Sequence, residues 1–86
     1  MASDPDTAPD LKPAATVDAL GLYCPMPIIM MAKEIKKIDV GQVLAVLADD
    51  PGIEADLPAW CHTTGHEMID LGREGKVYTG RVRRRK

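Results

Sequence analysis

The stretch Gly21-Leu22-Tyr23-Cys24-Pro25-Met26-Pro27-Ile28 combines a turn residue, a cysteine and two closely spaced prolines. Proline suits the first turn of a helix, where its fixed φ is helical and its missing N–H removes no hydrogen bond. We therefore predict that a helix begins at Pro25 and that Cys24 lies at its N-terminus. The rest of the chain would then be a small scaffold that presents the Cys24 sulfur in an electropositive setting.

Apolar side chains recur at helical spacing after this start and form a stripe that faces a core. Asp39-Val40-Gly41 ends the predicted helix. Residues 42–48 are a nearly continuous apolar run, which is typical of a central strand. The helical stripe consists of Ile28, Met31, Ala32, Ile35 and Ile38.

The remaining segments predict three more strands and a second helix. Residues 16–20 form a short strand before Gly21. The second helix follows Asp49-Asp50-Pro51-Gly52, where an aspartate caps it, and it ends at Gly65. Pro58 inside it predicts either a kink or two short turns that meet there. Residues 66–71 and 76–82 form a hairpin whose turn is Gly72-Arg73-Glu74-Gly75. The apolar side of the second helix comprises Ile53, Leu57, Trp60, Cys61 and Thr64.

This order of elements predicts the fold. A strand–helix–strand crossover makes the first two strands parallel, and the final hairpin is antiparallel. We predict an α+β, two-layer sandwich of β-α-β-α-β-β order, with a mixed four-stranded sheet and two helices on one face. Residues 16–83 form this domain, residues 1–15 a disordered, proline-containing lead-in, and residues 84–86 a basic tail.

Length and charge limit the class of protein. A chain of 86 residues with 28% charged side chains and a net charge of −2 is one small globular domain. It has no segment apolar enough to span a membrane and no signal-peptide pattern, so we predict a cytoplasmic protein with two reduced cysteines. The basic end, residues 81–86, is compatible with contact to RNA or an acidic partner, but a solvated terminus is the simpler interpretation.

Cys24 is the candidate reactive group. A helix N-terminus favours the thiolate, and the N–H groups of Met26 and Ile28 are the donors that the two prolines leave available. There is no dedicated base nearby in the sequence and no second cysteine at Cys-x-x-Cys spacing. These features favour thiol–disulfide or persulfide exchange over hydrolysis. The alternative is that Cys24 is a small buried hydrophobe.

Other residues have more ordinary interpretations. Cys61 reads as a core residue, and its spacing from the two histidines and Cys24 does not match a zinc site. No cofactor-binding motif is present. Met26 and Met30, with Lys33 one turn further, are candidates for a partner-binding rim around Cys24. The alternative is that these methionines pack against a neighbouring loop.

Several motifs together resemble the TusA/SirA sulfur-carrier family. They are Asp18-Ala-Leu-Gly21-Leu-Tyr-Cys24-Pro25-Met-Pro27, Ala48-Asp49-Asp50-Pro51, Asp56-Leu57-Pro58-Ala59-Trp60-Cys61 and Gly65-His66-Glu67. The similarity extends over about residues 17–82. It implies the β-α-β-α-β-β fold, with Pro25, Met26, Pro27 and Ile28 shaping the site around Cys24. One departure is Tyr23, where the family often has arginine.

The resemblance also implies a function. The cysteine at position 24 would accept sulfane sulfur as a persulfide from a cysteine desulfurase or rhodanese-like donor and pass it to an acceptor protein. Family destinations include tRNA thiolation, molybdenum cofactor synthesis and sulfur oxidation. We therefore hypothesise a cofactor-free sulfur carrier, monomeric when free. The alternatives are a regulatory module that binds a partner without moving sulfur and, ranked last because the tail lacks aromatic residues, an RNA-binding protein.

Overall fold

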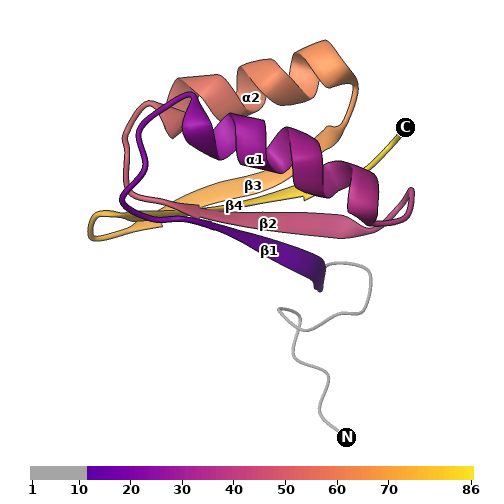
Figure 1. Ribbon diagram of the computed structural model, residues 1–86, viewed down its shortest axis with the longest axis horizontal. Coiled ribbons are helices and arrows are strands. Elements are labelled where there is room, and N and C mark those ends of the chain that lie inside the picture. Colours follow the sequence, from indigo (N-terminus) through magenta and orange to yellow (C-terminus); the bar gives the residue numbers. More distant parts are fainter. Residues whose placement is uncertain (1–11) are drawn as a thin grey trace, which may run out of the picture.

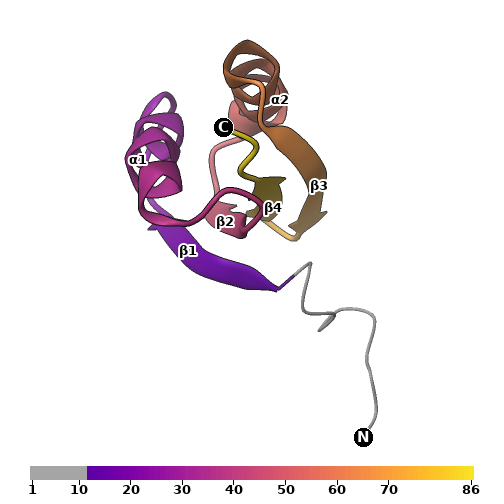
Figure 2. The same cartoon turned by 90° about the vertical axis from the view of Figure 1, so that its right-hand side faces the viewer.

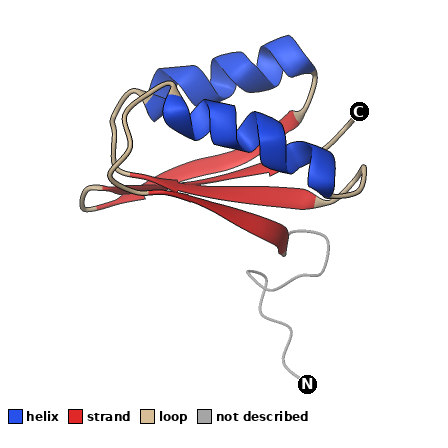
Figure 3. Ribbon diagram, viewed as in Figure 1, coloured by secondary structure: helices blue, strands red, loops and turns tan. Residues whose placement is uncertain are grey.

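The computed structural model describes residues 12–86 and contains the predicted succession of strands and helices (Figures 1 and 3). The predicted order of strand, helix, strand, helix, strand, strand is confirmed. No helix in this part of the chain has the length and apolar character needed to cross a membrane. The elements are β1 (Pro13–Ala19), α1 (Met26–Glu34), the 3-10 turn η2 (Ile35–Lys37), β2 (Val43–Ala48), α2 (Ile53–Thr64), β3 (Glu67–Glu74) and β4 (Val77–Arg83).

The sheet has the strand order β1-β2-β4-β3. β1 pairs with β2 in parallel, whereas β2–β4 and β3–β4 are antiparallel. Both helices cover one face of this sheet, α1 over β1 and β2 and α2 over β3 and β4 (Figure 2). The predicted α+β, two-layer architecture with a mixed sheet is therefore confirmed.

The core lies between the sheet and the two helices. Strand β2 is internal, as its continuous apolar sequence predicted, and five of its six residues are buried. Ile28 packs partly buried against the core, next to the fully buried Met31. The described residues contain no buried polar or charged residue, so burial of aliphatic surface is the main source of stability. The core cluster consists of Val17, Ala19, Met31, Ile35, Ile38, Leu44, Val46, Ala48, Ile53, Leu57, Cys61, Tyr78 and Val82.

The first strand begins at Pro13, earlier than predicted. Residues 13–15 were predicted to belong to a disordered lead-in, and for these residues the prediction is wrong. Their side chains alternate between half-buried and exposed, as in the rest of β1. Because Ala14 and Ala15 are small, the alternation of apolar and polar residues that predicts a strand is weak here. Residues 1–11 of the predicted lead-in lie outside the described residues.

The hairpin between β3 and β4 is tighter than predicted. Pairing continues to Glu74 opposite Val77, so the turn is Gly75-Lys76 and not the predicted segment of residues 72–75. Gly75 has a φ of 63°, which suits a two-residue turn that follows the twist of the strands. Gly72 remains inside β3.

The observed ends of the two helices agree only in part with the predicted ones. α1 begins at Met26, with Pro25 as its N-cap, and Pro27 lies in its first turn. α2 runs as one helix through Pro58, so two separate turns do not form. Gly65 ends α2 as predicted, in a left-handed conformation with its N–H donating to the Cys61 carbonyl at 2.9 Å.

Candidate functional site

Cys24 lies in the loop between β1 and α1, directly before the N-cap of α1. The Cys24–Pro25 peptide bond is cis. The Met26 N–H donates to the Tyr23 carbonyl at 2.9 Å, which closes the loop into a turn around the cysteine. The predicted position at a helix start is therefore found, but the Met26 N–H is not available as a donor to the sulfur.

Two aspartates after β2 hold this loop. The Asp49 carboxylate accepts the Gly21 N–H, with its oxygens at 3.0 and 3.1 Å. Asp50 Oδ2 accepts the Cys24 N–H at 2.7 Å, and Asp50 Oδ1 accepts the Gly52 N–H at 3.2 Å. We call Asp49 and Asp50 the aspartate clamp, because together they tie the cysteine loop to the loop that follows β2.

The clamp replaces the predicted helix cap. α2 has Gly52 as its N-cap and no side-chain cap bond, so the prediction that an aspartate caps this helix is wrong. Because β1 and β2 are parallel, the loops after them meet at the same edge of the sheet, where the carboxylates find unpaired N–H groups of the other loop. The donated N–H groups of Cys24 and Gly52 lower the pKa of Asp50.

The sulfur of Cys24 lies against the start of α2. A Cβ atom placed on Gly52 would lie 3.1 Å from Cys24 Sγ and 3.3 Å from Cys24 Cβ. Gly52 has ordinary helical dihedral angles, so close approach to the cysteine, and not backbone conformation, favours glycine here. The thiol is half-buried as a result.

The surroundings of the thiol are acidic. Burial raises the pKa of Cys24 to about 12, with further contributions from a hydrogen bond and charge repulsion by Asp56 and from Asp50. The expected electropositive setting and helix-stabilised thiolate are therefore wrong. Asp56 lies in the first turn of α2, and its charge adds to the effect of burial on the thiol. Cys24 is a thiol at neutral pH.

Exposed apolar side chains surround the cysteine loop. Tyr23 is 79% exposed, Met26 44% and Ile29 43%. Met26, Ile29 and Lys33 recur at spacings of three and four residues and so share one face of α1. We call Tyr23, Met26, Ile29 and Lys33 the rim.

The rim differs in part from the predicted set of residues. Met30, which was also predicted for this surface, packs partly buried against the core. Ile29 was missed, although its spacing from Met26 is the signal that identifies it. Of the predicted site-shaping residues, Pro25 is exposed, Pro27 is buried and Ile28 is half-buried.

Cys61, the second cysteine, is part of the hydrophobic core. Cys61 is buried, and burial raises the pKa of its thiol to about 11. This agrees with its predicted place on the apolar side of α2. Among residues 12–86, no three His, Cys, Asp or Glu side chains are grouped so as to hold a metal ion.

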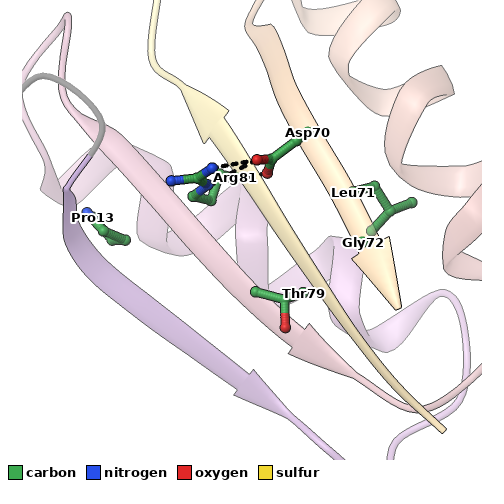
Figure 4. A pocket seen from close by; sticks show the side chains of 6 residues that line it. All are labelled: Pro13, Asp70, Leu71, Gly72, Thr79 and Arg81. Atoms are coloured by element: carbon green, nitrogen blue, oxygen red, sulfur yellow. Dashed lines mark hydrogen bonds and ion pairs between the residues drawn. The ribbon is translucent and has the colours of Figure 1, made fainter. Parts of the chain in front are cut away.

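A hollow of about 480 Å³ on the sheet offers no alternative reactive centre (Figure 4). Thr79 and Arg81 line it from the sheet face opposite the helices, because they alternate with the buried Gly80 and Val82 along β4. The Arg81 guanidinium forms an ion pair with Asp70 there. No nucleophilic cysteine lines this hollow, so Cys24 remains the candidate site.

Comparisons with known proteins identify the family of this chain. Residues 15–84 match the family described as "Sulfurtransferase TusA". The chain is 38% identical to the sulfur carrier protein TusA of Pseudomonas entomophila over 76 residues, which cover 88% of this chain and 95% of that protein. It is 43% identical over 67 residues to the putative sulfur carrier protein YrkF of Bacillus subtilis, covering 78% of this chain but 36% of YrkF.

The fold has a matching crystal structure. A SirA-like protein from Desulfitobacterium hafniense superposes with a TM-score of 0.72 at 26% identity, over 84% of this chain and 99% of that one. The match in fold and the family match over residues 15–84 extend across the whole sheet and both helices. This chain therefore belongs to the TusA family.

Proposed function

We propose that this protein is a sulfur carrier that holds sulfane sulfur as a persulfide on Cys24. The main support for this proposal is the structure of the loop that holds Cys24. Two carboxylates fix the Cys24 backbone at the edge of the sheet, next to exposed apolar side chains, in a chain of the TusA family. A single thiol without a paired cysteine suits exchange of sulfur between proteins.

The exchange balances without a cofactor. The Cys24 sulfur attacks the terminal sulfur of a persulfide on the donor cysteine. A new S–S bond forms on Cys24, and the donor's S–S bond breaks. The donor sulfur leaves with the electron pair and takes up the proton lost by the Cys24 thiol, so that a thiol and a persulfide yield a persulfide and a thiol.

The acidic surroundings give the carrier a protected resting state. Because burial, reinforced by Asp56 and Asp50, keeps Cys24 protonated, the free protein reacts slowly with disulfides and oxidants. The Asp56 carboxylate acts on the thiol, and in this proposal it takes the thiol proton when a donor arrives. Reaction is thereby reserved for partners that dock on the cysteine loop.

We further propose that the rim is the docking surface for these partners. A cysteine desulfurase or rhodanese-like protein supplies the sulfur in the cytoplasm, and an acceptor protein of tRNA thiolation, molybdenum cofactor synthesis or sulfur oxidation receives it. Exposed methionine and isoleucine side chains adapt to more than one partner, as a relay requires.

Labelled sulfur tests the carrier function. The protein is incubated with a cysteine desulfurase and cysteine that carries radioactive sulfur, and then separated from both. We expect wild-type protein to retain label that dithiothreitol releases as sulfide, whereas Cys24→Ser retains none. Equal retention of label by Cys24→Ser would contradict the proposal.

Calorimetry with the desulfurase tests the docking surface. Met26→Ser with Lys33→Glu should weaken binding at least about fivefold, because the change removes an apolar contact and reverses a charge. Lys12→Glu, an exposed residue just before β1 and so at the opposite end of that strand from the cysteine loop, is the matched control and should bind normally. Unchanged affinity in the Met26/Lys33 variant excludes the rim as the docking surface.

A further inference from the structure

A second pocket lies at the far end of the helix layer from Cys24. It has a volume of about 410 Å³ and is lined by residues from α1, η2, α2 and the C-terminal segment. Both helices begin beside the cysteine loop and end near the C-terminus (Figure 1). Cys24 and Ile35 are therefore about 16 Å apart at a helical rise of about 1.5 Å per residue. The lining residues are Ala32, Ile35, Lys36, Trp60, Thr64, His66, Arg84 and Lys86.

Cationic side chains line this pocket. Lys36, Arg84 and Lys86 line it, and no aspartate or glutamate does. Within residues 12–86, the amines of Lys36 and Lys86 form no ion pair. Three cationic side chains, one from η2 and two from the C-terminal segment, meet here in a protein of net charge −2 and form a local site for an anion.

Arg84 is held in place by the backbone around it. Its N–H donates to the Gln42 carbonyl at 2.9 Å, and its own carbonyl accepts the Gly41 N–H at 2.7 Å. Its Nε donates to the Lys86 backbone oxygen at 2.9 Å, and its Nη1 donates to the Ile38 carbonyl. Nη2 forms no hydrogen bond within residues 12–86, which leaves donors of a fixed guanidinium for a ligand.

His66 adds a neutral donor. Its Nδ1 accepts the Arg85 N–H at 3.1 Å, so the ring proton of the neutral imidazole is on Nε2. Burial lowers the pKa of His66, and repulsion by Arg84 and Lys86 lowers it further. The flat ring of Trp60 lies beside it, with the two ring centroids 5.5 Å apart.

We propose that this pocket binds a phosphate monoester that carries a flat aromatic group, such as a nucleoside monophosphate. A phosphate monoester carries a charge near −2 at neutral pH and several acceptor oxygens, which matches two amines and a guanidinium. Trp60 offers the face on which an aromatic base stacks. The volume is in the range of pockets that hold small ligands.

The fluorescence of Trp60, the single tryptophan of the chain, reports directly on this pocket. We expect AMP to change it saturably, and adenosine or inorganic phosphate to bind at least about tenfold more weakly, since each lacks half of the contacts. Lys36→Ala with Lys86→Ala should weaken AMP at least about fivefold, whereas the matched control Lys76→Ala should not. Cys24→Ser should bind AMP like the wild type, because the site is independent of sulfur transfer.

The proposal is overturned if AMP leaves the fluorescence unchanged at millimolar concentration, or if Lys76→Ala weakens binding as much as the pocket variant. Equal binding of AMP and inorganic phosphate also contradicts it, because stacking would then contribute nothing. A 5′-phosphorylated RNA dinucleotide that binds more tightly than AMP identifies an RNA end as the source of the ligand, and weaker binding identifies a free nucleotide.

Discussion

The sulfur of Cys24 has carboxylates as its polar neighbours. Asp50 accepts the Cys24 N–H, and Asp56 contributes to the raised pKa of the thiol. The pKa of the thiol is raised from 9.0 to about 12, so the contribution of this group to folding stability is fully present below about pH 9 and is lost as the pH rises towards 12. The reactivity of the free thiol should rise over the same pH range, because the thiolate is the nucleophile.

Replacing Asp56 by asparagine should therefore activate Cys24. Loss of the negative charge lowers the thiol pKa, and the rate of alkylation by iodoacetamide near pH 8 should rise roughly 3- to 10-fold. Glu54→Gln removes an exposed charge from the same turn of α2 and should leave the rate unchanged. An alkylation rate in Asp56→Asn equal to that of the wild type would show that Asp56 does not act on the thiol.

Gly52→Ala tests the close approach of the sulfur. The new methyl group would lie 3.1 Å from Cys24 Sγ, so we expect the thiol to shift outward and its alkylation rate to change at least about twofold. Gly72→Ala, where nothing lies within 4 Å of the added carbon, is the control for the substitution itself. Identical alkylation of both variants contradicts the proposed contact.

The sequence identified Cys24 and its prolines, but not these neighbours. Local rules apply to adjacent residues, and they placed Cys24 at a helix start correctly. Asp50 and Asp56 are 26 and 32 positions away, and only the parallel pairing of β1 with β2 brings them to the sulfur. An aspartate before a helix has the same local pattern whether it caps that helix or accepts a distant N–H.

At the scale of elements, the aspartate clamp connects the loop after β1 with the loop after β2. Asp50→Asn should speed hydrogen exchange of the Cys24 amide at neutral pH, measured by NMR, because the carboxylate acceptor is lost. Asp39→Asn, an exposed aspartate without a side-chain bond within residues 12–86, is the control. Unchanged protection of the Cys24 amide in Asp50→Asn would mean that the clamp does not hold the loop.

The hydrogen bond from the Cys24 N–H to Asp50 has a predictable pH dependence. The pKa of Asp50 is lowered by the N–H groups that it accepts, so its stabilising effect is complete above its ordinary value of 3.8. It is lost only as the pH falls through the lowered value. The exchange rate of the Cys24 amide, corrected for its intrinsic pH dependence, should therefore be constant from neutral pH to about pH 4.

The packing of α2 on β4 depends on Gly80. A Cβ atom there would lie 2.7 Å from Leu57 Cδ2 and 3.2 Å from Val46 Cγ1, and both side chains are fully buried. Gly80→Ala should lower the free energy of unfolding by about 1–3 kcal/mol in urea titrations, since the core has no room to relax. Gly72→Ala, in the neighbouring strand, should change it by less than about 1 kcal/mol. Equal stability of the two variants contradicts this packing.

The elements themselves were largely predictable because their apolar periods are clear. β2 and the two helices carry strong patterns of buried residues. The predicted first strand was too short because the first residues of β1 are small. The hairpin turn was predicted at the wrong place because Gly72 has the same local signal as the true turn residue Gly75. Pairing with β4, a tertiary interaction, decides between these two glycines.

On the scale of the whole molecule, the two ends of the helix layer differ in charge. Asp49, Asp50 and Asp56 lie around the cysteine loop, whereas Lys36, Arg84 and Lys86 line the pocket at the other end. The predicted basic tail is part of this second end. Arg84 pairs with the chain around Gly41, so it is not a loose, solvated residue.

The measurement that tests the central claim most directly is mass spectrometry of the protein after incubation with a cysteine desulfurase and cysteine. Trapping with iodoacetamide and peptide analysis should find one added sulfur atom on Cys24 and none on the buried Cys61. Cys61→Ser should load normally, and Cys24→Ser should not load. Added sulfur on Cys61 alone, or loading that persists in Cys24→Ser, would contradict the account.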